Sequence, residues 1–353
     1  METDESPLRW VSKKNVDWAR VQELLAPCAV TNHYANRGCV TPYLETLLAR
    51  VLDLEYGYSV IVTSSGHAAL YALAATIALQ KGDMRWGVQS FTFPASAQIP
   101  GNVEIVDIDE SGGLDLLSVP PGTNGIVVTN PFGYVVDISK YEKYCQDNNI
   151  ALMFDNAAAP LSRYNGKNIC SFGDGSIISL HHTKPIGFGE GGAVIVRSHL
   201  APTVRRVINF GIGLNDRDWS LLGINGKMSE VSAAFVVQYL EKNVELVKAH
   251  HSERLAQVQK FIADEGKSCG LTILPSFGET TIPSCICIVL NRDSERHIDL
   301  LNKEGIEARR YYKPLSEAPV ARDLWSCIIC IPCHQDVSES KMRKVLELLA
   351  SAA

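Results

Sequence analysis

One lysine of this sequence stands in a setting that favours covalent chemistry. Lys184 follows the apolar segment 175–180, and a turn with four glycines within 187–192 separates it from a second apolar segment, 193–196. A lysine held between two buried strands is poorly solvated, and desolvation favours its uncharged, nucleophilic amine. The glycines let another group approach the backbone closely. A glycine-rich β-turn that carries a surface lysine is the alternative explanation.

An acidic residue stands at the end of another apolar segment. Asp155 directly follows Ile150-Ala-Leu-Met-Phe154, which is predicted to be a buried strand. An isolated buried carboxylate is costly, so an acid in this position is expected to be paired or catalytic. The alternative is that Asp155 caps a helix formed by Asn156-Ala-Ala-Ala159.

A serine–glycine turn provides a candidate phosphate site. Ser59-Val-Ile-Val-Thr63 is predicted to be a strand, and Ser64-Ser-Gly-His-Ala-Ala-Leu70 leads from it into a helix. The first N–H groups of a helix lack intrahelical acceptors and lie at the positive end of the helix dipole, which suits a phosphate. An ordinary N-cap by Ser64 or Ser65 is the alternative.

The elements around these residues follow an α/β pattern. Further strand-like segments begin near residues 86, 103 and 125, and helical patterns such as 139–147 lie between several of them. This alternation predicts a mostly parallel sheet with helices on both faces, in which ligands bind beyond the carboxyl ends of the strands. Phe93 and Asp155 both follow predicted strands.

Two domains are predicted. Residues 1–245 would form a large α/β domain, and residues 246–353 a smaller α+β domain. A long amphipathic helix, from about Glu230 to Ile262, would connect the two.

The N-terminal region contains a candidate binding loop. A helical pattern that starts at Asp17 is predicted to end before Pro27, because proline breaks helices. The polar and aromatic loop 31–38 then precedes a core helix with Pro42 at its start. Such a loop suits a ligand contact, although a plain surface loop is the alternative.

Composition and charge narrow the class of protein. The chain is 46% hydrophobic and 20% charged, and its formal charge of −6 argues against nucleic acid and membrane surfaces as partners. Its first residues are acidic and polar, unlike a signal peptide, and no apolar stretch is long enough to span a bilayer. These features predict a cytoplasmic protein.

The ten cysteines allow a metal hypothesis that we do not favour. Cys327, Cys330, Cys333 and His334 are closely spaced, and Cys285 and Cys287 could form a pair. The apolar segment 327–333 is predicted to be a buried strand, whose side chains alternate between faces. Packing as small hydrophobic residues in a reducing cytosol is therefore expected, with no metal site.

The lysine, the acid, the aromatic residue and the phosphate turn match the requirements of pyridoxal phosphate. This cofactor needs a lysine for its Schiff base and an acid beside its ring nitrogen. The acid keeps that nitrogen protonated, which makes the ring an electron sink. An aromatic side chain stacks on the ring, and helix-terminal amides with a hydroxyl hold the phosphate.

The sequence resembles the sugar-nucleotide aminotransferases of the DegT/DnrJ/StrS type. The family's pattern Ser-aromatic-His-x-x-Lys, followed by Gly-Glu-Gly-Gly, is similar to Ser179, His181, Lys184 and Gly189-Glu-Gly-Gly192. Other family motifs resemble Ser65-Gly-His-Ala-Ala-Leu70, Thr92-Phe-Pro-Ala-Ser96, Gly223-Ile-Asn-Gly-Lys-Met228 and Asn36-Arg-Gly with Leu44-Glu45. The resemblance covers nearly the whole chain and implies the aspartate-aminotransferase-like fold, with a smaller C-terminal α+β domain.

The resemblance implies a role for each residue at the cofactor. Lys184 would carry the cofactor and move a proton between sugar carbon and cofactor carbon. Asp155 would partner the pyridine nitrogen, and Phe93 would stack on the ring. The phosphate would be held by Ser65, Gly66, His67, Ser179 and Asn225 of the partner subunit. The active unit would therefore be a homodimer.

The resemblance also implies the substrates. An amino group would pass from glutamate, through the pyridoxamine phosphate form, to the keto carbon of a nucleotide-linked sugar. The side chains expected to face that sugar are His33, Tyr34, Asn36, His181 and Tyr312. The His-x-x-Lys form is more similar to members that act on 4-keto sugars, which predicts a 4-amino-4,6-dideoxy product. A 3-keto sugar is the alternative.

Some positions depart from the family pattern. Ala158 stands where a glutamine or histidine is usual near the cofactor's 3-hydroxyl, and His67, Leu180 and Lys227 replace the usual threonine, phenylalanine and arginine. A PLP-binding regulatory or structural protein without transaminase activity is therefore a second hypothesis. The related sugar dehydratases carry histidine in place of the lysine, so Lys184 argues against that class.

Overall fold

A seven-stranded sheet forms the centre of the molecule. The computed structural model describes residues 7–158, 160–212, 219–266 and 269–351. The strand order is β1-β9-β8-β5-β4-β2-β3. The strands are β1 (Tyr58–Thr63), β2 (Arg85–Gln89), β3 (Asn102–Val106), β4 (Gly125–Thr129), β5 (Ala151–Asp155), β8 (Gly175–Ser179) and β9 (Gly192–Arg197). β9 is antiparallel to its neighbours and the other pairs are parallel, which confirms the predicted α/β class.

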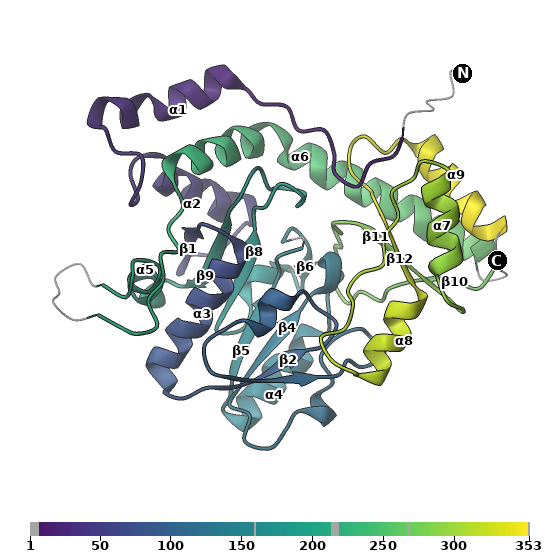
Figure 1. The fold of residues 1–353 in the computed structure, drawn as a ribbon, viewed down its shortest axis with the longest axis horizontal. Coiled ribbons are helices and arrows are strands. Elements are labelled where there is room, and N and C mark those ends of the chain that lie inside the picture. The colour runs from purple at the N-terminus through teal and green to yellow at the C-terminus, as the bar shows by residue number, and fades with distance from the viewer. Residues whose placement is uncertain (1–6, 159, 213–218, 267–268, 352–353) are drawn as a thin grey trace.

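Helices cover both faces of this sheet (Figure 1). α3 (Gly66–Lys81) packs on β8 and β9, and α5 (Ala201–Ile208) packs against α3. The other face is covered by α2 (Val40–Val51) and by the first half of α6 (Glu230–Phe261), with α1 (Trp18–Thr31) outside α6. α4 (Ile138–Asn148) packs on β5. β4, β5 and β8 are buried along their whole length, because both faces of the sheet are covered.

A smaller antiparallel sheet lies towards the C-terminus. It contains β10 (Leu271–Ile273), β11 (Ile286–Leu290) and β12 (Ile328–Ile331), with α7 (Glu295–Lys303), α8 (Pro319–Cys327) and α9 (Glu339–Ser351) around it. In Figure 1, α6 runs along the top from the central sheet to these helices. The predicted division at residue 245 falls within α6 and stays a prediction.

Short elements complete the described chain. They are β6 (Arg163–Tyr164), β7 (Lys167–Asn168), five 3₁₀ turns and one π turn: η1 (Pro94–Ala97), η2 (Leu116–Ser118), η3 (Pro131–Gly133), η4 (Ile169–Ser171), η5 (Ser198–Leu200) and η6 (Ile262–Gly266). None of the described helices combines the length and apolarity that crossing a bilayer requires.

Two sequence-based expectations about these elements are wrong. α1 continues through Pro27 to Thr31, and Asn32 in the left-handed conformation ends it with a hydrogen bond to the Cys28 carbonyl. The buried Cys28 side chain anchors this last part of the helix. The segment 327–333 is not one strand, because Cys327 ends α8 and β12 starts at Ile328.

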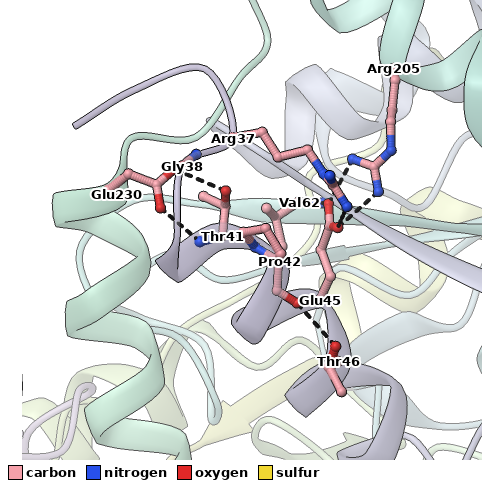
Figure 2. Close-up of polar contacts among 9 residues, drawn as sticks. All are labelled: Arg37, Gly38, Thr41, Pro42, Glu45, Thr46, Val62, Arg205 and Glu230. Atoms are coloured by element: carbon pink, nitrogen blue, oxygen red, sulfur yellow. Dashed lines mark hydrogen bonds and ion pairs between the residues drawn. The ribbon is translucent and has the colours of Figure 1, made fainter. Parts of the chain in front are cut away.

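The buried Glu230 caps helix α2 from a distant element (Figure 2). Its carboxylate accepts hydrogen bonds from the N–H groups of Gly38 (2.7 Å), Val40 (2.7 Å) and Thr41 (2.9 Å), and from the Thr41 hydroxyl (2.9 Å). The side chain of the N-cap residue Cys39 makes no capping hydrogen bond with the described start of the helix. Glu230 therefore satisfies donors at the start of α2 that have no intrahelical acceptor.

A second buried carboxylate, Glu45, ties α2 to its surroundings. It accepts two hydrogen bonds from the Arg205 guanidinium, at 2.9 and 2.8 Å, and one from Arg37 at 3.2 Å (Figure 2). Together, Glu230 and Glu45 hold the C-terminal end of loop 31–38 against α2.

Replacing Glu230 with alanine is expected to destabilise the protein. Three backbone N–H groups and one hydroxyl would lose their acceptor in a buried site, which should cost about 3 kcal/mol of unfolding free energy. Denaturant unfolding followed by circular dichroism measures the effect. Glu245→Ala, on an exposed part of the same helix, is the control. Equal unfolding midpoints for the two variants would contradict this role of Glu230.

Candidate active site

Lys184 lies on the hairpin that connects β8 to β9. Ser179 at the end of β8 pairs with Gly192 at the start of β9, and the Lys184 N–H donates to the His181 carbonyl at 2.8 Å. Burial lowers the pKa of Lys184 from its usual value, while the negative charge of Asp155 opposes this shift. The lysine and the acid, which the sequence placed at two separate strand ends, are thus neighbours in the fold.

Asp155 ends β5 and is only 3% exposed. Its Oδ2 accepts a hydrogen bond from the Ser96 hydroxyl at 2.6 Å, and its Oδ1 accepts one from the Ala157 N–H at 2.9 Å. Burial raises the pKa of Asp155, while these two hydrogen bonds and the charge of Lys184 oppose the rise. The described residues 156–158 are not helical, so Asp155 does not cap a helix there.

Three hydroxyl groups, linked by hydrogen bonds, lead to the Asp155 carboxylate. The Thr92 Oγ1 lies 3.0 Å from the Ser96 Oγ and 2.6 Å from the Thr129 Oγ1, and all three residues are buried. Sequence reasoning gave Ser96 no role of its own, although it ends the motif Thr92-Phe-Pro-Ala-Ser96. Its place in that motif was the available signal.

The predicted phosphate turn lies beside the end of β8. Ser65 is the N-cap of α3, and its hydroxyl accepts a hydrogen bond from the Ala68 N–H at 3.1 Å, so the capping interpretation is confirmed. Gly66 and His67 precede Ala68 in the first turn, where N–H groups lack intrahelical acceptors. A Cβ placed on Gly66 would lie 3.0 Å from the Ser179 Cβ, so Ser179 lies against this turn.

Phe93 and Tyr312 are the two aromatic residues predicted to lie at this site. The Phe93 side chain is 61% exposed at the end of the segment that follows β2. Tyr312 comes from the C-terminal part of the chain and stacks on Phe132, with ring centroids 4.6 Å apart. Burial and the nearby charge of Asp155 raise the pKa of Tyr312 well above its usual value. Tyr312 therefore reaches the Asp155 side of the site.

Four other predicted site residues are exposed, namely His33, Tyr34, Asn36 and Asn225. His33, Tyr34 and Asn36 are exposed on the loop between α1 and α2, and the Tyr34 carbonyl accepts a hydrogen bond from the Glu230 N–H at 3.0 Å. Asn225 is exposed and forms an antiparallel bridge with Asn209.

Within the described parts of the chain, the His181 side chain makes local polar contacts. Its Nδ1 lies 2.8 Å from the Thr183 Oγ1, and its Nε2 lies 3.4 Å from the Glu190 carboxylate. Among the described residues, no hydrogen bond of the predicted substrate side chains reaches Lys184 or Asp155 in this single chain. Their substrate roles stay predictions.

Lys14 forms hydrogen bonds to the hairpin that carries Lys184. Sequence reasoning did not predict this contact. The Lys14 Nζ donates hydrogen bonds to the carbonyls of His182 (2.8 Å), Lys184 (2.7 Å) and Gly187 (2.6 Å). Burial lowers the pKa of Lys14 to about 7. Three carbonyl acceptors match the three N–H donors of an ammonium group and favour that form. A lysine near the N-terminus, next to another lysine, gives no sequence signal of such a contact.

Lys14→Met is expected to loosen the hairpin that carries Lys184. The three carbonyls would lose their donor in a largely buried site, which should cost about 2–3 kcal/mol of stability. The pH titration of the bound cofactor's visible absorption should also shift, because the Lys184 backbone is no longer fixed. Lys13→Met, at the exposed neighbouring position, is the matched control. A variant with unchanged unfolding and titration would show that Lys14 does not position the hairpin.

The cysteines that lie together in the structure are not those that are closely spaced in the sequence. The Sγ atoms of Cys285, Cys287 and Cys330 lie within 4.8 Å of one another, and all three residues are buried. Cys327 belongs to a helix and does not join them. Cys287 on β11 pairs with Cys330 on β12, and Cys285 directly precedes β11, so strand pairing rather than sequence spacing brings the three together.

The chain is similar to known aminotransferases. The family model described as "DegT/DnrJ/EryC1/StrS aminotransferase family" matches residues 18–350. The dTDP-4-amino-4,6-dideoxy-D-glucose transaminase of Shigella dysenteriae is 25% identical over 343 residues, which cover 90% of each chain. The GDP-perosamine synthase of Vibrio cholerae is 24% identical over 86% of this chain and 84% of its own.

Solved structures share the fold. A structure of DesI with its TDP-sugar product has a TM-score of 0.85 at 23% identity, over 98% of this chain and 93% of its own. NtdA from Bacillus subtilis, with the cofactor PMP bound, has a TM-score of 0.84 at 17% identity, over 99% of this chain and 85% of its own.

The described residues match what pyridoxal phosphate requires. A lysine of lowered pKa and a buried carboxylate are neighbours. Among the residues that the structure describes, no cationic side chain forms a hydrogen bond with this carboxylate. Gly66 lies at a helix N-terminus with Ser179 packed against it, whereas the buried Ala158 side chain offers no polar group. The protein is a PLP-dependent aminotransferase, and with its match from residue 18 to residue 350 the chain belongs to the DegT/DnrJ/EryC1/StrS aminotransferase family.

Proposed function

We propose that this enzyme transfers an amino group from glutamate to the C4 keto carbon of a nucleotide-linked 4-keto-6-deoxyhexose. The observation that carries the chemistry is the pairing of a desolvated lysine with a buried carboxylate, Lys184 and Asp155. The His-x-x-Lys form of the motif and the 4-amino-4,6-dideoxy sugars in the names of the relatives support the position of the amino group. The product would be a 4-amino-4,6-dideoxy sugar nucleotide.

Lys184 and Asp155 would have different roles in the reaction. Bound pyridoxal phosphate supplies an electron sink for the bond-breaking step. Lys184 would take a proton from one carbon and return it to the other, and its lowered pKa leaves free amine for this purpose. The negative charge of Asp155 would hold a proton on the ring nitrogen, with Ser96 fixing its orientation.

The remaining contacts are assigned as follows. The N–H groups of Gly66 and His67, together with Ser179, would hold the phosphate, and the Ser65 hydroxyl would mainly shape the turn because it caps α3. Phe93 would stack on the ring.

The nucleotide sugar would meet loop 31–38, with His33, Tyr34 and Asn36, as well as His181 and Tyr312. The active unit would be a cytoplasmic homodimer. In it, Asn225 of the partner subunit would complete the phosphate site.

A substrate panel tests this proposal. The holoenzyme, with glutamate as amino donor, is assayed against 4-keto-6-deoxy sugars linked to dTDP, UDP and GDP. A 3-keto-6-deoxy sugar linked to dTDP is the control. A 4-amino product from at least one of the first three supports the proposal, and amination of the 3-keto control alone would contradict it.

A non-catalytic PLP-binding protein is the second candidate, and Ala158 is the observation that favours it. Absorption spectra separate the two. An enzyme bleaches its visible band when glutamate converts the cofactor to the pyridoxamine form, whereas a regulatory or structural homologue keeps the band.

A further inference from the structure

Two thiols lie in contact at the base of loop 31–38. The Sγ atoms of Cys28, in the last turns of α1, and Cys39, the N-cap of α2, are 2.8 Å apart. Both cysteines are free thiols. A disulfide bond is about 2.0 Å long, so only a small movement separates this pair from bonding distance.

The Cys28 and Cys39 thiols link the two ends of this loop. Residues 29–37 are exposed, and the C-terminal end of the loop is fixed by Glu230 and by the ion pair of Arg37 with Glu45 (Figure 2). The N-terminal end is held by a backbone bond from His33 to the Cys28 carbonyl, at 3.0 Å. A bond from Cys28 to Cys39 would therefore join the two ends covalently.

Exposure sets the order of reaction at this pair. Cys39 is exposed, while Cys28 is buried, and burial, the Cys39 thiol and the charge of Glu230 raise the pKa of Cys28 to about 11. Cys39 is thus the thiol that an external reagent meets first. A metal ion is the weaker explanation, because both oxygens of Glu230 already accept hydrogen bonds from the backbone of α2 and its preceding loop.

We propose that Cys28 and Cys39 form a reversible thiol–disulfide exchange site for low-molecular-weight disulfides, and that its oxidation fixes the loop in the conformation seen here. The Cys39 thiolate attacks the small disulfide, forms a mixed disulfide and releases one small thiolate. The Cys28 thiolate then attacks the Cys39 sulfur and releases the second. The protein dithiol loses two electrons, and the small disulfide gains them and takes up the two protons as two thiols.

Peptide mapping tests the pairing without reference to activity. The holoenzyme is incubated with oxidised glutathione, free thiols are alkylated, and the protein is digested with trypsin without reduction. Cys28 and Cys39 fall in different tryptic peptides, Val21–Arg37 and Gly38–Arg50, and each contains one cysteine. The expected product is the linked pair of these peptides, with two of the ten thiols lost. It should form in Cys145→Ser but not in Cys28→Ser or Cys39→Ser.

Two results would overturn the exchange site. One is a mixed disulfide that stays on Cys39 without forming the linked peptides. The other is linkage that appears only after denaturation. If either serine variant fails to fold, the wild-type peptide map still decides the question.

The consequence for catalysis rests on the proposed function, because it assumes that loop 31–38 contacts the nucleotide sugar. A loop already fixed needs less ordering on binding, so oxidation should lower KM for the sugar by about fivefold. The half-reaction with glutamate should not change, and a reductant should reverse the effect. An unchanged KM in the fully linked protein would show that fixing the loop does not affect binding of the nucleotide sugar. Failure to aminate any sugar would refute the proposed substrate but leave the peptide result standing.

Discussion

Lys184→Ala should lose transamination by about a thousandfold or more, since the amine that binds the cofactor and carries the proton is gone. The lowered pKa of Lys184 shows that burial already prepares this amine for reaction. The visible absorption band of the lysine-bound cofactor should disappear as well. Turnover with glutamate and a keto sugar, together with the absorption spectrum, measures both effects.

The controls for this variant separate chemistry from folding. Lys143→Ala removes an exposed lysine on α4 and should keep both the band and the activity. Added methylamine should restore part of the Lys184→Ala activity, because a small amine can enter the space left by the side chain. Undiminished transamination by Lys184→Ala would assign the proton transfer to another group.

The site residues that could be predicted from the sequence are those that lie at or just after the ends of strands. Lys184 and Asp155 each follow an apolar segment that is predicted to be a buried strand, and the carboxyl ends of neighbouring parallel strands meet at one edge of the sheet. The Gly66 turn was predictable for the same reason, because it connects a strand to a helix.

The residues that sequence reasoning missed act through contacts between distant segments. Lys14 bonds to carbonyls about 170 positions away, and Glu230 caps a helix that begins 190 positions earlier. Neither residue has an unusual local pattern, since one is a lysine beside a lysine and the other an acid at a helix start. Such contacts depend on how whole elements pack, which local periodicity does not encode.

At Pro27 and Cys327, local sequence patterns predicted the wrong secondary structure. Proline removes one helical hydrogen bond, but α1 gains enough packing at Cys28 to continue. The apolar character of 327–333 favoured a strand, yet Cys327 ends helix α8 before the strand begins. In both places tertiary packing decided the outcome.

Asp155→Asn should reduce turnover by about 100- to 1,000-fold while leaving the fold intact. The amide has the size of the carboxylate, and the Ser96 hydroxyl, which now donates to Oδ2, can rotate to accept from an N–H instead. The Ala157 N–H keeps its acceptor in the amide oxygen. What is lost is the negative charge that would hold a proton on the cofactor ring. Steady-state rates with glutamate, and the conversion of the visible band, measure this loss.

The same variant makes a prediction for the protein without cofactor. Burial raises the pKa of Asp155, so the folded state holds its proton to higher pH than the unfolded chain does. Stability should therefore fall as the pH rises from the unfolded to the folded pKa of this group, and stay lower above it. Asp155→Asn cannot ionise, so its apoprotein should unfold at a higher temperature near neutral pH and lack this part of the pH dependence.

Asp147→Asn, at an exposed position on α4, should leave the unfolding curve unchanged. An apoprotein of Asp155→Asn that unfolds more easily than the wild type would mean that the carboxylate stabilises the fold. The proposed role of Asp155 predicts the opposite, namely that its carboxylate lowers the stability of the apoprotein and serves to bind a positively charged ligand.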